Sequence, residues 1–203
     1  MVAASIFARL AAEAAAVRDG QDHVRTQELL NVCREMLPVL DRFGTSFVIV
    51  RSDVGGNINR LAKRQAEDPG RYSVINAIIE EEVSKQDLGS SSCTKGLLWL
   101  KRAMEFVVAL LKRLHDDQNV TLATAANEVY YATLYKYHGW ITSSAFVLAL
   151  KLVPSREVFF EKLGTPGRGL MNEMYQFISA FSSVLAQIQK FLADRGLDDP
   201  AKV

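Results

Sequence analysis

The sequence has few cysteines and none of the spacings that usually make cysteines functional. Its 203 residues include only Cys33 and Cys93, with no Cys-x-x-Cys pair and no cysteine/histidine ligand spacing. This argues against a disulfide framework and against a zinc site, and it predicts free thiols in a reducing compartment. We expect no metal and no cofactor.

Long apolar runs are also missing. No stretch approaches the ~20 consecutive apolar residues that a membrane-spanning helix needs. The first 20 residues have the apolar content of a signal peptide, but Arg9 and Glu13 interrupt them and no basic segment precedes them. They are predicted to form an amphipathic helix. The sequence therefore predicts a soluble, cytoplasmic protein whose contact with a membrane is peripheral and transient.

The chain has no excess of charge of either sign. Lys and Arg number 24 against 23 Asp and Glu, which gives a net charge of +1. A nucleic-acid-binding protein usually carries a basic surplus, so we expect no nucleic-acid partner, although a local basic patch can still attract an anionic membrane.

Motifs for enzymatic chemistry are absent as well. The sequence contains no nucleophile elbow, no phosphate-binding loop and no metal-ligand cluster. The one enzymatic alternative pairs the carboxylate of Asp53 with Glu80 or Glu81 as in a glycoside hydrolase, but no spacing rule supports such a pair on helices. We expect a protein that is not an enzyme.

Strand signals are scarce, while helical periodicity runs through most of the chain. Breakers such as the Asp68-Pro69-Gly70 turn separate the helical stretches, and Ser92 or Thr94 is suited to cap one of them. We find no repeat and no long linker, so residues 1–203 are expected to form a single all-α domain. The expected helices cover residues 3–18, 26–41, 43–66, 72–86, 94–116, 121–150, 155–163 and 168–194.

The most informative stretch is DVGGNINR, which places Asp53, Asn57 and Arg60 at i, i+4 and i+7. On a helix these side chains share one face and offer a carboxylate, an amide and a cation. The set suits a neutral ligand rich in hydroxyl groups, with Arg60 also able to hold Asp53 in place. Gly55 and Gly56 between them suggest that something approaches the helix closely. The alternative is an ordinary solvated helix face.

Two later motifs extend this pattern. GLLWLKRAMEF carries Trp99 inside an apolar run, and YKYHGW carries His138 two residues before Trp140. Each motif is weakly specific alone. In this order, after DVGGN, the set resembles the glycolipid transfer protein family from about Leu37 to Pro154.

This resemblance implies both a fold and a function. The family fold is an all-α, two-layer sandwich of about eight helices that encloses lipid chains between its layers. The implied function is a soluble carrier that binds a glycosphingolipid, such as glucosylceramide or galactosylceramide, and transfers it between membranes. A glycolipid sensor or adaptor would use the same binding residues and remains an alternative.

The resemblance also assigns roles to the polar residues. Asp53, Asn57 and Trp99 match the family's sugar-binding residues, and Arg60 stands where the best-known members have lysine. That departure keeps the cation but changes its donor geometry. His138 matches the histidine that bonds the ceramide amide region; without the resemblance, a core histidine would be the simpler interpretation.

Apolar residues are harder to assign because any helical domain needs a core. Phe43 and Phe47 lie in an almost wholly apolar segment that is either buried or lines a cavity, and Phe146 and Leu150 match positions that line the family's chain pocket. Trp140 matches the tryptophan through which the family contacts membranes, the alternative being a buried packing residue.

One position separates the family's branches. Members that carry ceramide phosphate have arginine where this chain has Trp99, and an indole cannot neutralise a phosphate. Lys95, one turn earlier, lies where the phosphate-binding branch carries another arginine, and is a possible cation at the rim of the site. We therefore expect a sugar head group, with ceramide-1-phosphate as the alternative ligand.

Overall fold

The computed structural model describes residues 5–19, 23–164 and 167–202. Within these residues the chain forms nine α-helices and two short 3-10 helices, and no strand. The elements are α1 (Ile6–Ala16), α2 (Thr26–Asp41), η1 (Thr45–Phe47), α3 (Val48–Glu67), α4 (Ile75–Lys85), α5 (Cys93–Asp116), α6 (Leu122–Ala132), η2 (Tyr135–Tyr137), α7 (Trp140–Leu150), α8 (Arg156–Glu161) and α9 (Arg168–Asp194).

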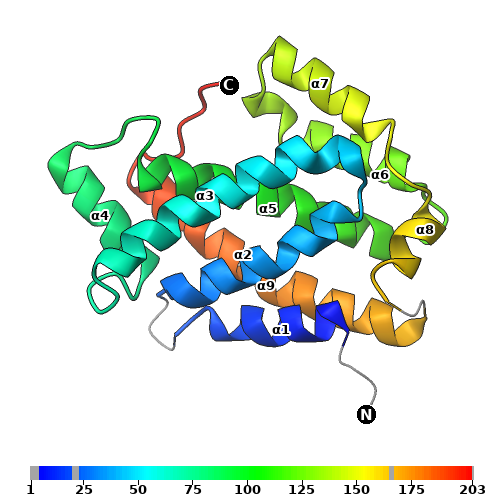
Figure 1. The fold of residues 1–203 in the computed structure, drawn as a ribbon, viewed down its shortest axis with the longest axis horizontal. Coiled ribbons are helices and arrows are strands. Elements are labelled where there is room, and N and C mark those ends of the chain that lie inside the picture. Colours follow the sequence, from blue (N-terminus) through cyan, green and yellow to red (C-terminus); the bar gives the residue numbers. More distant parts are fainter. Residues whose placement is uncertain (1–4, 20–22, 165–166, 203) are drawn as a thin grey trace.

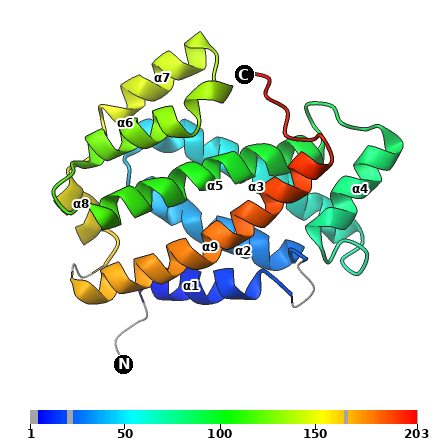
Figure 2. The same ribbon diagram turned by 180° about the vertical axis from the view of Figure 1, so that it is seen from behind.

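The helices form two layers. Figure 1 shows α2 and α3 packed side by side in front of α5 and α9, and Figure 2 shows α5 and α9 from the other side. Helix α1 packs against both α9 and α2 at one edge, and α6 packs against α5. The predicted all-α, two-layer sandwich is confirmed.

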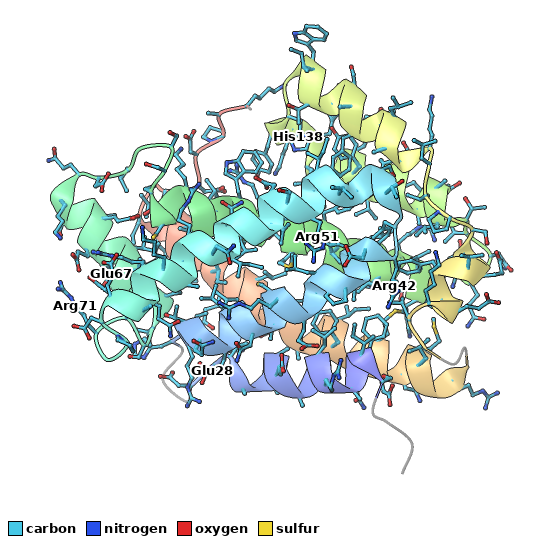
Figure 3. All side chains as sticks on the ribbon, in the orientation of Figure 1. Glu28, Arg42, Arg51, Glu67, Arg71 and His138 are labelled. Atoms are coloured by element: carbon cyan, nitrogen blue, oxygen red, sulfur yellow. The ribbon has the colours of Figure 1, made fainter. Side chains whose placement is uncertain are left out.

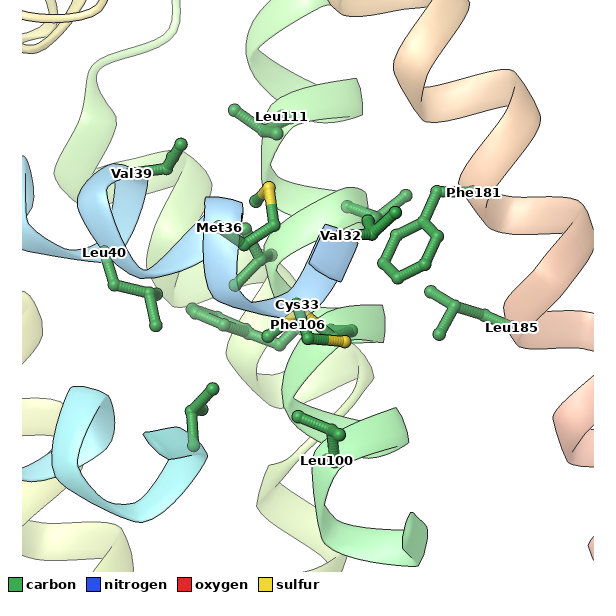
Figure 4. Packing of buried hydrophobic residues seen from close by; sticks show 14 of the residues in the cluster. Val32, Cys33, Met36, Val39, Leu40, Leu100, Phe106, Leu111, Phe181 and Leu185 are labelled. Atoms are coloured by element: carbon green, nitrogen blue, oxygen red, sulfur yellow. The ribbon is translucent and has the colours of Figure 1, made fainter. Parts of the chain in front are cut away.

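The core lies between the two layers. Figure 4 shows Met36 of α2, Phe106 of α5 and Phe181 of α9 among the buried side chains that gather there. Each such side chain contributes roughly 1.5–3 kcal/mol through its removal from water. Helix α5 is the central element, because it contacts α3, α4, α6 and α9.

The helix predicted over 121–150 is broken in two, and this corrects the sequence prediction. Helix α6 ends where the Thr133 amide bonds the carbonyls of both Val129 and Tyr130. His138 is extended (φ −97°, ψ 134°), and Gly139 precedes the first residue of α7. His138 therefore lies at a bend between helices and not on a helix face.

The helix predicted over 43–66 also begins later than expected. Gly44 has φ +96°, a left-handed conformation that favours glycine, and the 3-10 helix η1 separates it from α3. Phe43 therefore lies in the turn before η1 and Phe47 at the end of η1, which contacts α7.

The start of α5 is fixed by a buried carboxylate on α4. Glu82 accepts hydrogen bonds from the backbone amides of Cys93 and Thr94 and from the Thr94 hydroxyl, each at 2.7 Å. Ser92, one of the two predicted caps, accepts from the Lys95 amide at 3.1 Å. Together these bonds satisfy amides that have no partner inside the helix and hold α5 in register with its neighbours.

Crossing a bilayer requires a length and an apolar character that no helix in the described part of the chain possesses.

Candidate functional site

Asp53, Asn57 and Arg60 share one face of α3, as the sequence predicted, and they line a shallow open hollow on the surface. Asn57 is buried and its Nδ2 donates to Asp53 Oδ2 at 3.4 Å, whereas the Asp53 side chain meets solvent. The hollow is completed by Val48, Ile49, Ser52 and Gly56.

Arg60 is held differently from the prediction. Its Nη1 donates to the backbone carbonyls of Ser90 and Ser92 at 3.2 and 3.1 Å, so it is fixed to the loop before α5 and makes no ion pair with Asp53. Those carbonyls lie within reach because α3 and α5 pack closely beside this loop. Arg60 therefore acts on Asp53 through its charge alone.

The Asp53 carboxylate has an unusual environment for a residue that meets solvent. Surrounding protein atoms displace enough water to raise its pKa, and the charge of Arg60 offsets part of this rise. The ionised carboxylate is thus less well solvated than a free one, which strengthens its need for hydrogen-bond donors.

Helices α3 and α5 approach each other closely at Gly96. A Cβ atom on Gly96 would lie 3.1 Å from Arg60 Cδ and 3.6 Å from Asn57 Oδ1. Because Arg60 lies beside Ser92 and Asn57 beside Gly96, the two helices run antiparallel. The next turn of each helix brings Asp53 and Trp99 to the same level.

In the described part of the chain no protein segment approaches Gly55 or Gly56 closely, and a close approach by a ligand stays a prediction. Apart from their own chain neighbours and helix backbone, no atom of the described residues lies within 4 Å of a Cβ atom built at either position. The close contact with α5 is made instead beside Asn57 and Arg60, where Gly96 lies. At Gly56 the open space belongs to the hollow itself.

The half-buried Trp99 side chain is surrounded by aromatic and cationic groups. Its ring stacks on His138 with centroids 6.2 Å apart and an interplanar angle of 23°, and it meets Tyr137 edge-on at 6.4 Å. The buried Arg102 guanidinium lies 5.0 Å from the Trp99 ring centroid and 3.5 Å from that of Tyr137. These contacts fix the orientation of the indole before any ligand arrives.

His138 is buried between Trp99 and Tyr130, in the region between α3 and the beginning of α7 (Figure 3). Its Nδ1 lies 3.1 Å from the Tyr130 hydroxyl, and among the described residues Nε2 has no hydrogen-bond partner. Burial lowers the pKa of His138, so the ring is neutral at neutral pH. A neutral imidazole held at Nδ1 can bond a ligand through Nε2.

A continuous line of rings, which we call the aromatic column, leads from His138 into the interior. The centroids of His138 and Phe146 are 5.6 Å apart, and those of Phe146 and Phe47 are 5.9 Å apart. Phe47 and Phe43 follow at 5.1 Å, and Phe43 and Phe159 at 4.8 Å. The column joins the polar site to the core through side chains alone.

The four residues predicted to contact lipid chains, Phe43, Phe47, Phe146 and Leu150, are all buried. Their packing satisfies the requirements of a core without a ligand. Their burial therefore fits both interpretations, that they are core residues and that they contact lipid chains.

Helix α7 is apolar on its outer side as well as its inner side. Trp140 is 80% exposed, Ile141 65% and Leu148 60%, although each is large and apolar. The alternative of a buried packing tryptophan is thus wrong for Trp140. Tyr130 of α6, by contrast, is fully buried and contacts His138.

Lys95 lies one turn before Trp99 and forms an ion pair with Asp199. The sequence left open whether this lysine contacts a ligand or solvent, and its observed partner is a residue of the segment after α9. This interaction joins distant parts of the chain, so no local pattern could have predicted it.

The carboxylate pair considered for an enzyme is not assembled. Glu80 forms an ion pair with Arg195, and Glu81 accepts from the Tyr72 hydroxyl at 2.7 Å. Hydrogen bonds from Lys85 and Tyr72 lower the pKa of Glu81 to about 2, so it cannot supply a proton near neutral pH.

Three contributors to the site were missed in the sequence. Arg102 follows Trp99 by three residues, and this spacing could have identified it as a neighbour on the same helix face. Tyr130 lies eight residues before His138, across a break in the helix that the periodicity did not reveal. Asp199 belongs to a polar segment that carries no local signal.

Comparisons with known proteins agree on one family and one fold. Residues 24–165 match the family model described as Glycolipid transfer protein (GLTP). Over 184 residues the chain is 41% identical to Glycolipid transfer protein 1 of Arabidopsis thaliana, which covers 90% of this chain and 91% of that protein.

Solved structures share the architecture. One, described as "How FAPP2 Selects Simple Glycosphingolipids Using the GLTP-fold", has a TM-score of 0.91 at 25% identity, covering 98% of this chain and 100% of that one. Human ceramide-1-phosphate transfer protein in complex with 12:0 ceramide-1-phosphate has a TM-score of 0.86 at 20% identity, covering 95% and 97%. The named ligands of these relatives differ, so fold alone does not select a head group.

Proposed function

Because the chain belongs to the glycolipid transfer protein family, we propose that it carries a glycosphingolipid, such as glucosylceramide or galactosylceramide, from one membrane to another. Proteins of this family are lipid transfer proteins and not enzymes. The observation that carries the choice of ligand is the uncharged platform formed by Trp99 and His138 opposite Asp53.

In this proposal the sugar ring lies against the Trp99 indole, with its hydroxyl groups directed toward α3. Asp53 accepts from two hydroxyls, and Asn57 bonds hydroxyls as donor or acceptor. Each hydrogen bond to the ionised carboxylate is worth about 1.5–3 kcal/mol. Arg60 fixes the loop before α5 and adds its positive charge to the hollow.

The ceramide amide is proposed to bond Nε2 of His138. The hydrocarbon chains then follow the aromatic column inward, past Phe47 and Phe43, with Leu150 beside them. Each methylene moved from a bilayer into water costs about 0.8 kcal/mol, so a two-chain lipid cannot cross water without an apolar enclosure. Because the column is packed ring on ring, chain entry requires α7 and η1 to move apart.

A phosphate head group is less well supported. The cations Arg60, Lys95 and Arg102 already have partners within the protein: Arg60 bonds two carbonyls, and Lys95 and Arg102 bond the segment after α9. A phosphate carries about −1.5 to −2 charges at neutral pH and needs cations that are free to bind it. A sensor that binds glycolipid without transferring it would use the same site and differs only in kinetics.

Transfer between vesicles tests the proposal directly. Protein added to donor vesicles containing labelled glucosylceramide is expected to move the lipid to acceptor vesicles much faster than spontaneous exchange. Unlabelled glucosylceramide and galactosylceramide should compete with the labelled lipid, and ceramide-1-phosphate should not. Tight binding without accelerated transfer would indicate the sensor, and competition by ceramide-1-phosphate alone would overturn the choice of ligand.

Trp140 is proposed as the membrane contact, acting with the neighbouring Ile141. Moving a large exposed apolar side chain into a membrane is worth roughly 1.5–3 kcal/mol, so Trp140→Ala is expected to weaken vesicle partitioning by about tenfold or more. Binding of a water-soluble short-chain glycolipid should remain near wild type. The matched control is Tyr175→Ala, an exposed aromatic residue on α9, which should change neither measurement. Equal losses in both assays for Trp140→Ala would mean that it is no membrane anchor.

Binding is expected to weaken in acid, because it requires ionised Asp53 and neutral His138. The pKa of Asp53 is raised above its usual 3.8 by burial and that of His138 is lowered below 6.5 by burial, so Asp53 takes up its proton at a higher pH than an ordinary aspartate, while His138 is protonated only in acid. Affinity for a short-chain glycolipid should be constant from about pH 7 to 8 and fall between about pH 6 and 4. Titration calorimetry at each pH measures this, with circular dichroism to verify that the protein stays folded. Affinity that is unchanged down to pH 4 would contradict these roles.

A further inference from the structure

The segment after α9 turns back across the first half of α5. It begins where α9 ends at Asp194, and in both Figure 1 and Figure 2 the C-terminal end of the chain lies near the beginning of α7. Lys202 of this segment lines a surface pocket together with His138 and Trp140. We refer to residues 195–202 as the C-terminal strap.

Two adjacent carboxylates attach the strap to α5. Asp199 forms an ion pair with Lys95, and its backbone carbonyl accepts from Arg102 Nη2 at 2.6 Å. Asp198 Oδ1 accepts from the same Nη2 at 2.9 Å, and its Oδ2 accepts from Gln189 Nε2 at 2.9 Å.

The positions of the two cations make these contacts relevant to the ligand. Lys95 lies one turn before Trp99 on α5, and Arg102 lies one turn after it with its guanidinium 5.0 Å from the indole centroid. The strap therefore places a negative charge beside each of the two cations that flank the proposed sugar platform.

We propose that Asp198 and Asp199 are specificity-determining residues: by neutralising Lys95 and Arg102, they exclude lipids with a phosphate head group from the Trp99 site. The inference rests on the proposed function, because it takes Trp99 as the surface on which the head group lies. It goes further by assigning discrimination against phosphate to two residues that do not contact the sugar.

Electrostatics supports this assignment in two ways. A phosphate at Trp99 would have to displace the carboxylate from Lys95 or lie close to that carboxylate and be repelled by its negative charge. Either outcome costs energy in a partly desolvated site. The hydrogen bond from Lys95 lowers the pKa of Asp199, so the carboxylate is ionised throughout the neutral range. A neutral sugar experiences no such repulsion.

Asp199→Asn tests the proposal, because it removes the charge and keeps the shape of the side chain. The Lys95 side chain, already 28% exposed, would then be available to a phosphate. We expect affinity for short-chain ceramide-1-phosphate to rise by about tenfold, while affinity for short-chain glucosylceramide stays within about twofold of wild type. Both are measured by titration calorimetry on the full chain.

Asp194→Asn provides the matched control. Asp194 ends α9 and forms an exposed ion pair with Lys190, so this variant makes the same change in net charge away from α5. It should gain no affinity for ceramide-1-phosphate. An equal gain in both variants would show that net charge alone is responsible and would overturn the proposal.

The double variant Asp199→Asn/Lys95→Met locates the effect. If the released lysine binds the phosphate, removing it should return ceramide-1-phosphate affinity to the wild-type level, whereas a retained gain would contradict the role of Lys95.

Failure of this inference is distinguishable from failure of the proposed function. Wild-type protein that binds glucosylceramide while Asp199→Asn gains nothing overturns only the inference, and wild-type protein that binds no glycolipid overturns the function itself.

Discussion

Replacing Trp99 with alanine is expected to reduce glucosylceramide transfer by roughly 100-fold while leaving the helix content near that of wild type. The indole is the surface on which the sugar is proposed to lie, and loss of a tryptophan that anchors a ligand typically costs 2 kcal/mol or more, about 100-fold at 2.7 kcal/mol. Trp99 is only half-buried, and Arg102 beneath it keeps its contacts with Tyr137 and with Asp198. The fold should therefore tolerate the change.

Two measurements separate this outcome from its alternatives. Transfer of labelled glucosylceramide between vesicles reports the whole cycle, and binding of a short-chain glycolipid reports the site alone. Trp99→Ala should lose both activities, whereas Trp140→Ala should lose mainly transfer from vesicles. Transfer by Trp99→Ala at the wild-type rate would remove the platform from the proposal.

Asp53→Val is expected to abolish measurable transfer through a different loss. Valine cannot accept hydrogen bonds, so two sugar hydroxyls and the Asn57 amide lose their acceptor. At about 1.5–3 kcal/mol for each bond to a charged group, the combined effect exceeds 100-fold. Asn59→Val, an exposed asparagine on another face of α3, introduces the same side chain as a matched control and should leave transfer unchanged. Activity that survives Asp53→Val would exclude this face of α3 from the site.

Asp53→Asn should show that the carboxylate serves binding at the expense of stability. The pKa of Asp53 is higher in the folded protein than in the unfolded chain, so the folded state binds the proton more tightly. Stability then falls as pH rises through this pKa, and at neutral pH the charge is a net cost. The variant is expected to unfold at the same or a slightly higher temperature than wild type at pH 7, with no advantage once the pH falls below that pKa. A clear loss of thermal stability at pH 7 would mean that the carboxylate supports the fold.

The sequence predicted the polar helix face and the order of the motifs because both are local. Asp53, Asn57 and Arg60 have helical spacing, and α3 presents them on one face as expected. The Ser92 cap and the bounds of α2 and α9 were predictable for the same reason.

What the sequence could not show depends on contacts between distant segments. The break before α7 occurs at the extended backbone of His138, within a stretch that helical periodicity predicted as one helix over 121–150. The close approach of α3 and α5 occurs at Gly96, although Gly55 and Gly56 drew attention first. No periodic pattern in the sequence predicts the order of the rings in the aromatic column or the ion pair between Lys95 and Asp199.

The Glu82 carboxylate, which holds the first turn of α5, belongs to α4, and no residue of α4 lines the hollow. That carboxylate nonetheless fixes the position of Trp99 relative to Asp53, because a shift of α5 along its axis would move Trp99 with it. Natural variation in α4 can accordingly retune which lipids are accepted, and a survey restricted to ligand-facing positions would overlook its source.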